Sequence, residues 1–187
     1  MPGYDHIRRQ QLLREAEGYL DLIMVFGDQW PPSPEVRDRV AHRALEFLDK
    51  IAQPGTDWAY SLYLQGQALR CMERYQDALD PLRTSAHEDS ANIHVWLALG
   101  WCYKRLKRLD LAIEALEEAL AVDSGEAIIY YNLACYWSLA RNIDRAIHYL
   151  SMAFDIDPNY RDLVADEPDF DPVRSHHSFR MLTSVIV

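Results

Sequence analysis

The chain has 187 residues, 49% of them hydrophobic, and a formal net charge of −10 at pH 7. This length suffices for one sizeable core, and the negative charge argues against nucleic-acid binding by phosphate neutralisation. The N-terminus lacks the apolar stretch of a signal peptide, and no run approaches the roughly 20 apolar residues of a membrane span. We therefore expect a cytoplasmic protein that has no membrane span and does not bind nucleic acid; a monomer is favoured, and the oligomeric state stays open.

The first 57 residues predict a helical hairpin. Between about residues 4 and 26, apolar residues recur at helical spacing: Ile7, Leu12, Leu13, Ala16, Leu20 and Ile23. Three prolines within residues 31–34, directly after Trp30, predict a rigid loop. Ser33 suits an N-cap, Pro34 the first helical position, and Glu35 the positive helix end.

The second helix of this hairpin should run to about Ala52. Its expected buried stripe consists of Val40, Ala44, Phe47, Leu48 and Ile51. Ala44, Leu48 and Ile51 match the second helix of the repeat described below. We therefore interpret residues 1–57 as an N-terminal cap on a repeat array. Thr56 or Asp57 should then cap the next helix.

Residues 93–126 and 127–160 superimpose without a gap, which gives a period of 34. The paired positions are Trp96 and Tyr130, Leu99 and Leu133, Gly100 and Ala134, Tyr103 and Trp137, Ala112 and Ala146, Leu116 and Leu150, and Ala119 and Ala153. A weaker copy covers residues 59–92, in which Gly66, Ala78 and Leu82 take the corresponding places. Small residues at such places let two helices approach closely, with large apolar residues around them.

The period predicts six helices, at about 58–71, 75–88, 92–105, 109–121, 126–139 and 143–156. Pro81 falls inside the second of these ranges. A proline inside a helix costs about 3 kcal/mol, so we expect either a kink at 77–81 or a late helix start.

This pattern resembles the tetratricopeptide repeat (TPR), a unit of two antiparallel helices. The resemblance covers residues 59–160 as three units, with a closing proline only at Pro158. It implies an all-α fold, a right-handed superhelical array of helix hairpins with a cap at each end. A lone repeat cannot bury its apolar face, so about three must stack.

After Pro158, residues 161–187 are similar to the closing tail of many bacterial TPR proteins. We expect a short helix and a final helix to cover the last repeat, with Phe170, Val173, Phe179 and Leu182 as the plug. The acidic residues of this region are expected to be mostly solvated or to cap helices: Asp155, Asp157, Asp162, Asp166, Glu167, Asp169 and Asp171.

The resemblance also implies a binding groove lined by the first helix of each repeat. The groove positions that we single out are Tyr60, Tyr63, Gln67, Arg70, His94, Leu97, Trp101, Lys104, Arg105, Tyr131, Asn132 and Cys135. Their aromatic rings offer contact area, and their cations could pair with carboxylates of a peptide. Alternatively, these rings pack on neighbouring helices and these charges serve solubility. Tyr63 and Gln67 stand where the family's clamp for chaperone tails has Lys and Asn, which argues against that ligand; Asn132 alone matches the clamp.

Metal and catalytic sites are not indicated. Cys71, Cys102 and Cys135 cannot all pair with one another, and no CxxC or HxxxH spacing occurs. The adjacent His176 and His177 would diverge on a helix. A phosphate-binding glycine loop, a nucleophile elbow and an HExxH motif are also missing from the sequence. We expect no enzyme activity, metal or cofactor.

Three functions remain open at this point. The first is an adaptor that binds a peptide segment of a partner protein in its groove. The second is a chaperone for secreted subunits, which small acidic three-repeat bacterial proteins resemble. The third is a self-associating scaffold that uses apolar residues such as Trp30 or the Val185–Val187 end.

Overall fold

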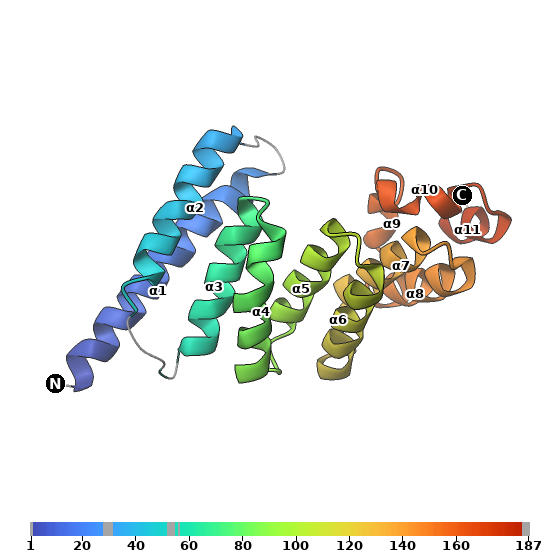
Figure 1. Ribbon diagram of the computed structural model, residues 1–187. Helices are drawn as coiled ribbons and strands as arrows, with labels where there is room; N and C mark the ends of the chain where they lie inside the picture. The colour runs from blue at the N-terminus through green and yellow to red at the C-terminus, as the bar shows by residue number, and fades with distance from the viewer. Residues whose placement is uncertain (1, 28–31, 52–54, 56, 185–187) are drawn as a thin grey trace. The chain divides into compact units, whose positions relative to one another are not determined.

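The computed structural model describes residues 2–27, 32–51, 55 and 57–184, and over these ranges the chain is all-helical (Figure 1). The helices are α1 (Pro2–Gly27), α2 (Pro34–Leu48), α3 (Trp58–Cys71), α4 (Tyr75–Glu88), α5 (Ile93–Arg105), α6 (Leu109–Val122), α7 (Ala127–Leu139), α8 (Ile143–Ile156), α9 (Tyr160–Leu163), the 3-10 helix η1 (Pro168–Phe170), α10 (Asp171–Arg174) and α11 (His177–Thr183). The six helices expected from the period of 34 are all present, and each end lies within one residue of its predicted position.

The chain forms two compact units, residues 1–91 and 92–187, which we call unit 1 and unit 2. In unit 1, the hairpin of α1 and α2 packs beside the hairpin of α3 and α4 (Figure 1). Its apolar cluster draws on three helices, with Leu20 from α1, Leu48 from α2 and Ala68 from α3 all buried. The N-terminal hairpin therefore packs against α3 through its apolar face, as expected for a capping element.

Unit 2 contains the hairpins α5–α6 and α7–α8, followed by a C-terminal tail, which we define as residues 160–184 (Figure 1). Its apolar cluster joins Leu116 of α6, Leu133 of α7 and Leu150 of α8 to buried tail residues. Phe170, Val173 and Phe179 are almost completely buried in this cluster, and Leu182 packs against it. The prediction that these four tail residues plug the last repeat is confirmed.

The turn inside each predicted repeat has one recurring geometry. Glu73, Lys107 and Arg141 have φ values of 59°, 60° and 58°, and they lie at the same place of the repeat. At Lys107, the amide donates to the carbonyl of Lys104 (2.9 Å), and the next amide, that of Arg108, donates to Tyr103 (2.9 Å). These two bonds form a Schellman motif, which satisfies carbonyls at the end of the first helix. The same pair of bonds recurs at the other two turns.

The seam between paired helices depends on small residues, as the sequence predicts. A Cβ atom at Gly66 of α3 would collide with Leu82 of α4, and one at Gly100 of α5 would lie 3.2 Å from Leu116 Cδ2 of α6. Ser85 of α4 replaces the usual small apolar residue; it is buried, and its hydroxyl donates to the Ala59 carbonyl (2.7 Å).

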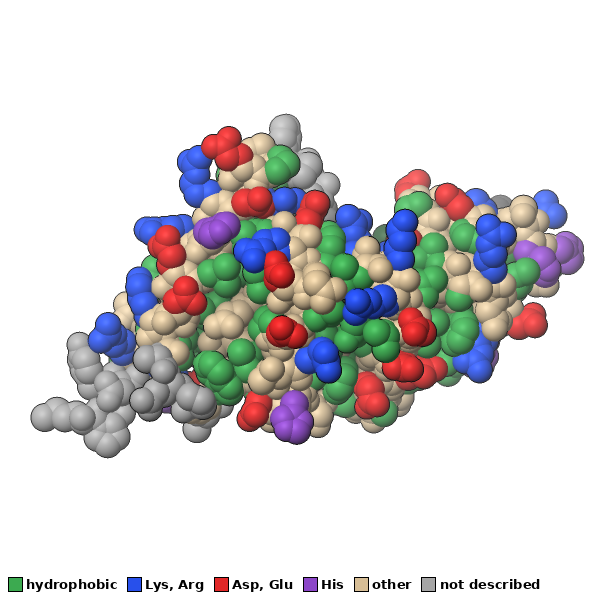
Figure 2. Space-filling model, in the orientation of Figure 1, with side chains coloured by type: hydrophobic (Ala, Val, Ile, Leu, Met, Phe, Trp, Pro, Cys, Tyr) green, Lys and Arg blue, Asp and Glu red, His purple; other side chains and the backbone are tan. Residues whose placement is uncertain are grey.

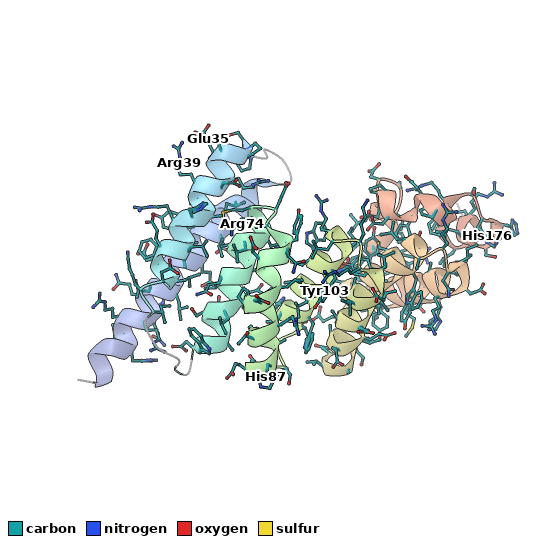
Figure 3. The ribbon with its side chains drawn as sticks, in the orientation of Figure 1. Glu35, Arg39, Arg74, His87, Tyr103 and His176 are labelled. Carbon is teal, nitrogen blue, oxygen red and sulfur yellow. The ribbon has the colours of Figure 1, made fainter. Side chains whose placement is uncertain are left out.

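The start of α2 agrees with its predicted capping. The Ser33 hydroxyl accepts a hydrogen bond from the Val36 amide (3.4 Å), and Pro34 opens the helix. Glu35 pairs with Arg39 one turn later at 2.8 Å, as Figure 3 shows. The predicted end at about Ala52 is wrong, because the helix ends at Leu48 and a turn at Asp49 and Lys50 follows.

Three further expectations need correction. Ile7 is 66% exposed rather than buried, because the first turns of α1 extend past the end of the shorter α2 (Figure 1). Asp57 precedes α3 as its N-cap residue, but its side chain makes no capping hydrogen bond. Of the two alternatives at Pro81, the late helix start is wrong, since α4 runs from Tyr75 to Glu88 with Pro81 inside it. Trp30, Pro31, Ala52, Thr56 and the Val185–Val187 end lie outside the described residues.

Candidate functional site

The predicted groove positions of unit 1 form one polar and aromatic row along α3. The Tyr60 hydroxyl donates to Glu17 Oε1 of α1 (2.5 Å), and its ring stacks on Tyr63 at a centroid distance of 6.0 Å. Farther along, Arg70 Nε donates to Gln67 Oε1 (2.6 Å). Desolvation by burial raises the pKa of the Tyr60 phenol, and the carboxylate of Glu17 raises it further. This row is therefore held together by contacts inside unit 1, with Gln67 buried and the other three side chains half-buried.

The predicted positions on α5 in unit 2 are more open. His94, Leu97, Trp101 and Arg105 follow one another at spacings of three and four residues, which places them on one helix face. His94 and Arg105 are exposed, Leu97 is half-buried, and Trp101 is 37% exposed. We call these four residues the α5 stripe.

The predicted positions on α7 lie under the tail. The ring of Tyr131 is tilted against Tyr160 (5.0 Å between centroids) and meets the edge of Phe170 (5.6 Å). Tyr131 is only 5% exposed and Cys135 only 2%, while Asn132 is half-buried. For Tyr131 and Cys135, the packing alternative of the sequence analysis is the one observed within unit 2.

Lys104 joins α5 to the tail. Its Nζ atom lies 2.5 Å from Asp169 Oδ2, and each of the two side chains is 15% exposed. The same ammonium lies 4.7 Å from the centroid of the Trp101 ring and 5.8 Å from that of Tyr136. Asp169 therefore departs from the expectation of a solvated carboxylate, and Lys104 already has an anionic partner inside the protein.

Backbone contacts brace the tail. Arg174 donates from its guanidinium to the carbonyls of Val164 (3.1 Å) and Glu167 (2.8 Å). Arg161 donates to the Leu182 carbonyl (2.9 Å), and its guanidinium lies 4.3 Å from the centroid of Phe154. These bonds link the segments of the tail to one another, and the Arg161–Phe154 contact joins the tail to α8.

The tail brings the carboxyl groups of Glu167 and Asp169 close to Cys135 of α7, which lies far from them in the sequence. Cys135 Sγ and one carboxylate oxygen each of Glu167 and Asp169 all lie within 4.8 Å of one another. Burial raises the pKa of the Cys135 thiol well above its ordinary value, and the two carboxylates raise it further. Sequence reasoning missed Glu167 and Asp169 as site residues because the tail lies outside the period of 34, so no repeat position predicts what they contact.

The remaining candidates take no part in this arrangement. His176 and His177 are exposed at the start of α11, and Figure 3 labels the first of them. Acidic and basic side chains are interspersed over the face drawn in Figure 2. Over the described ranges, no helix combines the length and apolar character that a membrane crossing requires.

The chain resembles segments of larger proteins. The family model of the anaphase-promoting complex, cyclosome, subunit 3 matches residues 39–119, from within α2 to within α6. The chain is 29% identical over 87 residues to "Protein bimA" of Emericella nidulans, which covers 46% of this chain and 11% of that protein. It is 24% identical over 119 residues to the N-terminal acetyltransferase A complex auxiliary subunit NAA15 of Arabidopsis thaliana. This match covers 64% of this chain and 13% of that protein. The chain thus spans only about a tenth of the length of these relatives.

Solved structures show the fold more completely. A crystal structure of MamA superimposes with a TM-score of 0.65 at 20% identity, covering 83% of this chain and 76% of MamA. The structure of MamA from Desulfovibrio magneticus RS-1, residues 41 to the end, superimposes with a TM-score of 0.61 at 19% identity. The match covers 90% of this chain and 93% of that structure. YrrB, described as a TPR protein with an unusual peptide-binding site, superimposes with a TM-score of 0.61 at 23% identity. The match covers 70% of this chain and 68% of YrrB. The period of 34, the sequential hairpins and these likenesses together identify the chain as a TPR-like helical repeat protein.

Proposed function

We propose that this protein is a non-catalytic interaction module that binds a peptide segment of a partner protein along the α5 stripe. The observation that carries the proposal is the exposure of Trp101 between Leu97 and Arg105 on one face of α5. A partly exposed indole beside a guanidinium provides the contact types that dominate protein interfaces. The fold adds support, because repeat arrays of this kind present extended binding surfaces.

The choice of α5 over α7 follows from the covering tail. Tyr131 and Cys135 are buried under Phe170 and its neighbours, so a partner would have to remove the tail to reach them. Removing the tail would expose three apolar side chains that are now almost completely buried. Exposing apolar surface to water costs about 25 cal/mol per Å², so the free-energy cost of removing the tail outweighs the gain from a few new contacts with a partner.

The α3 row of unit 1 is a weaker candidate, considered by itself. Tyr60, Tyr63 and Arg70 are half-buried and already in contact with neighbours inside unit 1. These side chains therefore offer a partner less free surface than the exposed residues of the α5 stripe.

A capture experiment with matched variants tests the proposal. Wild type, a Trp101→Ala, Arg105→Ala variant and a Val122→Ala, Arg83→Ala control would be immobilised, and captured proteins identified by mass spectrometry. The control also removes one exposed apolar residue and one exposed arginine, but from α6 and α4. Circular dichroism and thermal melting would establish that all three are folded.

Binding must then be measured directly with the captured protein. Overlapping synthetic peptides from its sequence would be titrated against the three proteins. We expect one peptide to bind wild type and control equally and the α5 variant at least about tenfold more weakly, since a hot-spot residue contributes 2 kcal/mol or more. Equal binding to the α5 variant would refute the assignment of the α5 stripe.

A further inference from the structure

The cluster of Cys135, Glu167 and Asp169 contains more donor atoms than its known contacts use. Lys104 Nζ pairs with Oδ2 of Asp169, and the Asp169 amide donates to Oε1 of Glu167 (3.0 Å). Each carboxylate therefore has a second oxygen that neither of these contacts engages. The thiol of Cys135 faces both carboxylates within 4.8 Å.

The charges of the cluster do not balance. Glu167 and Asp169 contribute two carboxylates, and Lys104 pairs with one of them, Asp169. The surplus negative charge lies in a partly desolvated place, since Lys104 and Asp169 are each 15% exposed. Partly buried charges are screened less than exposed ones, so this surplus attracts a cation.

A second observation concerns Tyr131, which lies near this cluster. The Tyr131 hydroxyl is buried and has no hydrogen-bond partner among the described residues. Tyr131 lies one helical turn before Cys135 on α7, and its ring meets that of Phe170, the residue after Asp169, at 5.6 Å between centroids, so this hydroxyl belongs to the same region of unit 2 as the cluster. A buried hydroxyl without a partner is unfavourable, and a metal-bound water would supply the missing hydrogen bond.

We propose that Cys135, Glu167 and Asp169 bind a thiophilic divalent cation of the Zn²⁺ class, which fastens the tail to α7. One thiolate and two carboxylate oxygens are ligands that Zn²⁺ accepts in tetrahedral sites, with a fourth position left for water. Binding replaces the S–H bond of Cys135 with a metal–sulfur bond, and the proton goes to solvent. Lys104 keeps its contact with Asp169.

The geometry requires only a small adjustment. With Zn–S near 2.3 Å and Zn–O near 2.1 Å, tetrahedral donors lie roughly 3.5 Å apart. The three donor atoms, now within 4.8 Å, need to close by roughly 1 Å, which side-chain rotation can supply. The ligands come from α7 and from the loop that Arg174 braces, so the backbone on both sides is already in place.

Cadmium binding to the untagged full chain is the sharpest test, because a Cd²⁺–thiolate bond gives a charge-transfer absorption in the near ultraviolet. The chain would be stripped with a chelator, dialysed under reducing conditions and titrated with Cd²⁺, then with Zn²⁺ as competitor. We expect the band to saturate at one equivalent and to disappear when Zn²⁺ is added.

Cysteine variants locate the site. A Cys71→Ser, Cys102→Ser variant keeps Cys135 as its single thiol and should retain the full band, whereas Cys135→Ser should lose it. Glu167→Gln keeps the side-chain size and should weaken Cd²⁺ binding by about 100-fold or more, since even groups outside the ligand shell change affinity 10–100-fold. This variant also tests the proposal if Cys135→Ser fails to fold.

A third measurement tests the fastening of the tail. Limited proteolysis of the wild type should show slower cleavage after Leu163 or within residues 175–184 when Zn²⁺ is present, and no such change in Cys135→Ser. Absence of the Cd²⁺ band in the wild type, its persistence in Cys135→Ser, or unchanged proteolysis on addition of Zn²⁺ would each overturn the proposal. None of these outcomes depends on whether the α5 stripe binds a partner.

Discussion

Glu73, Lys107 and Arg141 occupy a left-handed backbone conformation that L-residues rarely adopt. The side-chain Cβ atom makes this conformation unfavourable by roughly 1–2 kcal/mol, and glycine avoids that cost. The three residues persist there because the two hydrogen bonds of the Schellman motif require this backbone at each turn. The backbone conformation of a single residue thus repeats with the period of 34, although one of the three side chains is acidic and two are basic.

Replacement of Lys107 by glycine should therefore stabilise the protein. We expect the free energy of unfolding to rise by about 0.5–1 kcal/mol, less than the full relief, because glycine also gains entropy in the unfolded chain. Urea titration followed by circular dichroism measures the difference. Lys107→Ala is the control, since alanine keeps the Cβ atom; an equal gain from alanine would show that the backbone conformation is not the cause.

At the scale of the element, the pairing of α3 with α4 and of α5 with α6 depends on the glycine that faces a buried leucine. A Cβ atom at Gly66 would collide with the Leu82 side chain, whereas a Cβ atom at Gly100 would lie 3.2 Å from Leu116 Cδ2. Both leucines are completely buried, so neither can swing into solvent. The two seams share a pattern but differ in how closely their helices approach.

The variants Gly66→Ala and Gly100→Ala should consequently behave differently. Alanine improves helix propensity by about 1 kcal/mol at either site. At Gly66 we expect overpacking to outweigh this gain and to lower the free energy of unfolding by about 1–3 kcal/mol. At Gly100 the shift needed is a few tenths of an ångström, so we expect little net change. Thermal unfolding of both variants decides the matter, and equal melting temperatures would contradict the packing argument.

Most elements could be predicted from the sequence because the repeat encodes them locally. Small residues such as Gly66 and Ala78 indicate where two helices pack closely. Because the pattern repeats every 34 residues, the helix ends of one repeat predict those of the next. The errors occur where the period gives no information. Ile7 has helical spacing but lies beyond the end of α2, and Asp57 has the right residue type but makes no capping bond.

The candidate site was predictable only in part, for the same reason. Trp101 and Arg105 were found because their repeat positions imply a helix face, and the structure places both on the exposed side of α5. The contact of Lys104 with Asp169 and the cluster of Cys135 with Glu167 depend on how the tail folds back. That placement is set by the burial of tail apolar residues against α7 and α8, which no local pattern specifies.

At the scale of the whole molecule, the described residues form an apolar cluster in each of the two units. One lies in unit 1 and contains Leu20 among its buried members; the other lies in unit 2 and contains Leu150. Stability in repeat arrays is approximately a sum of the contributions of single repeats and their nearest neighbours. A defect in one cluster should therefore lower stability mainly where that cluster lies.

Native-state hydrogen exchange on Leu20→Ala and Leu150→Ala tests this locality. Both leucines are almost completely buried, so each change should cost about 2–5 kcal/mol from lost burial and the cavity left behind. We expect Leu20→Ala to reduce protection in α1, α2 and α3 while α7 and α8 keep theirs, and Leu150→Ala to do the reverse. A uniform loss of protection in either variant would mean that the chain opens as one cooperative body, and the two clusters would then be parts of a single folding unit.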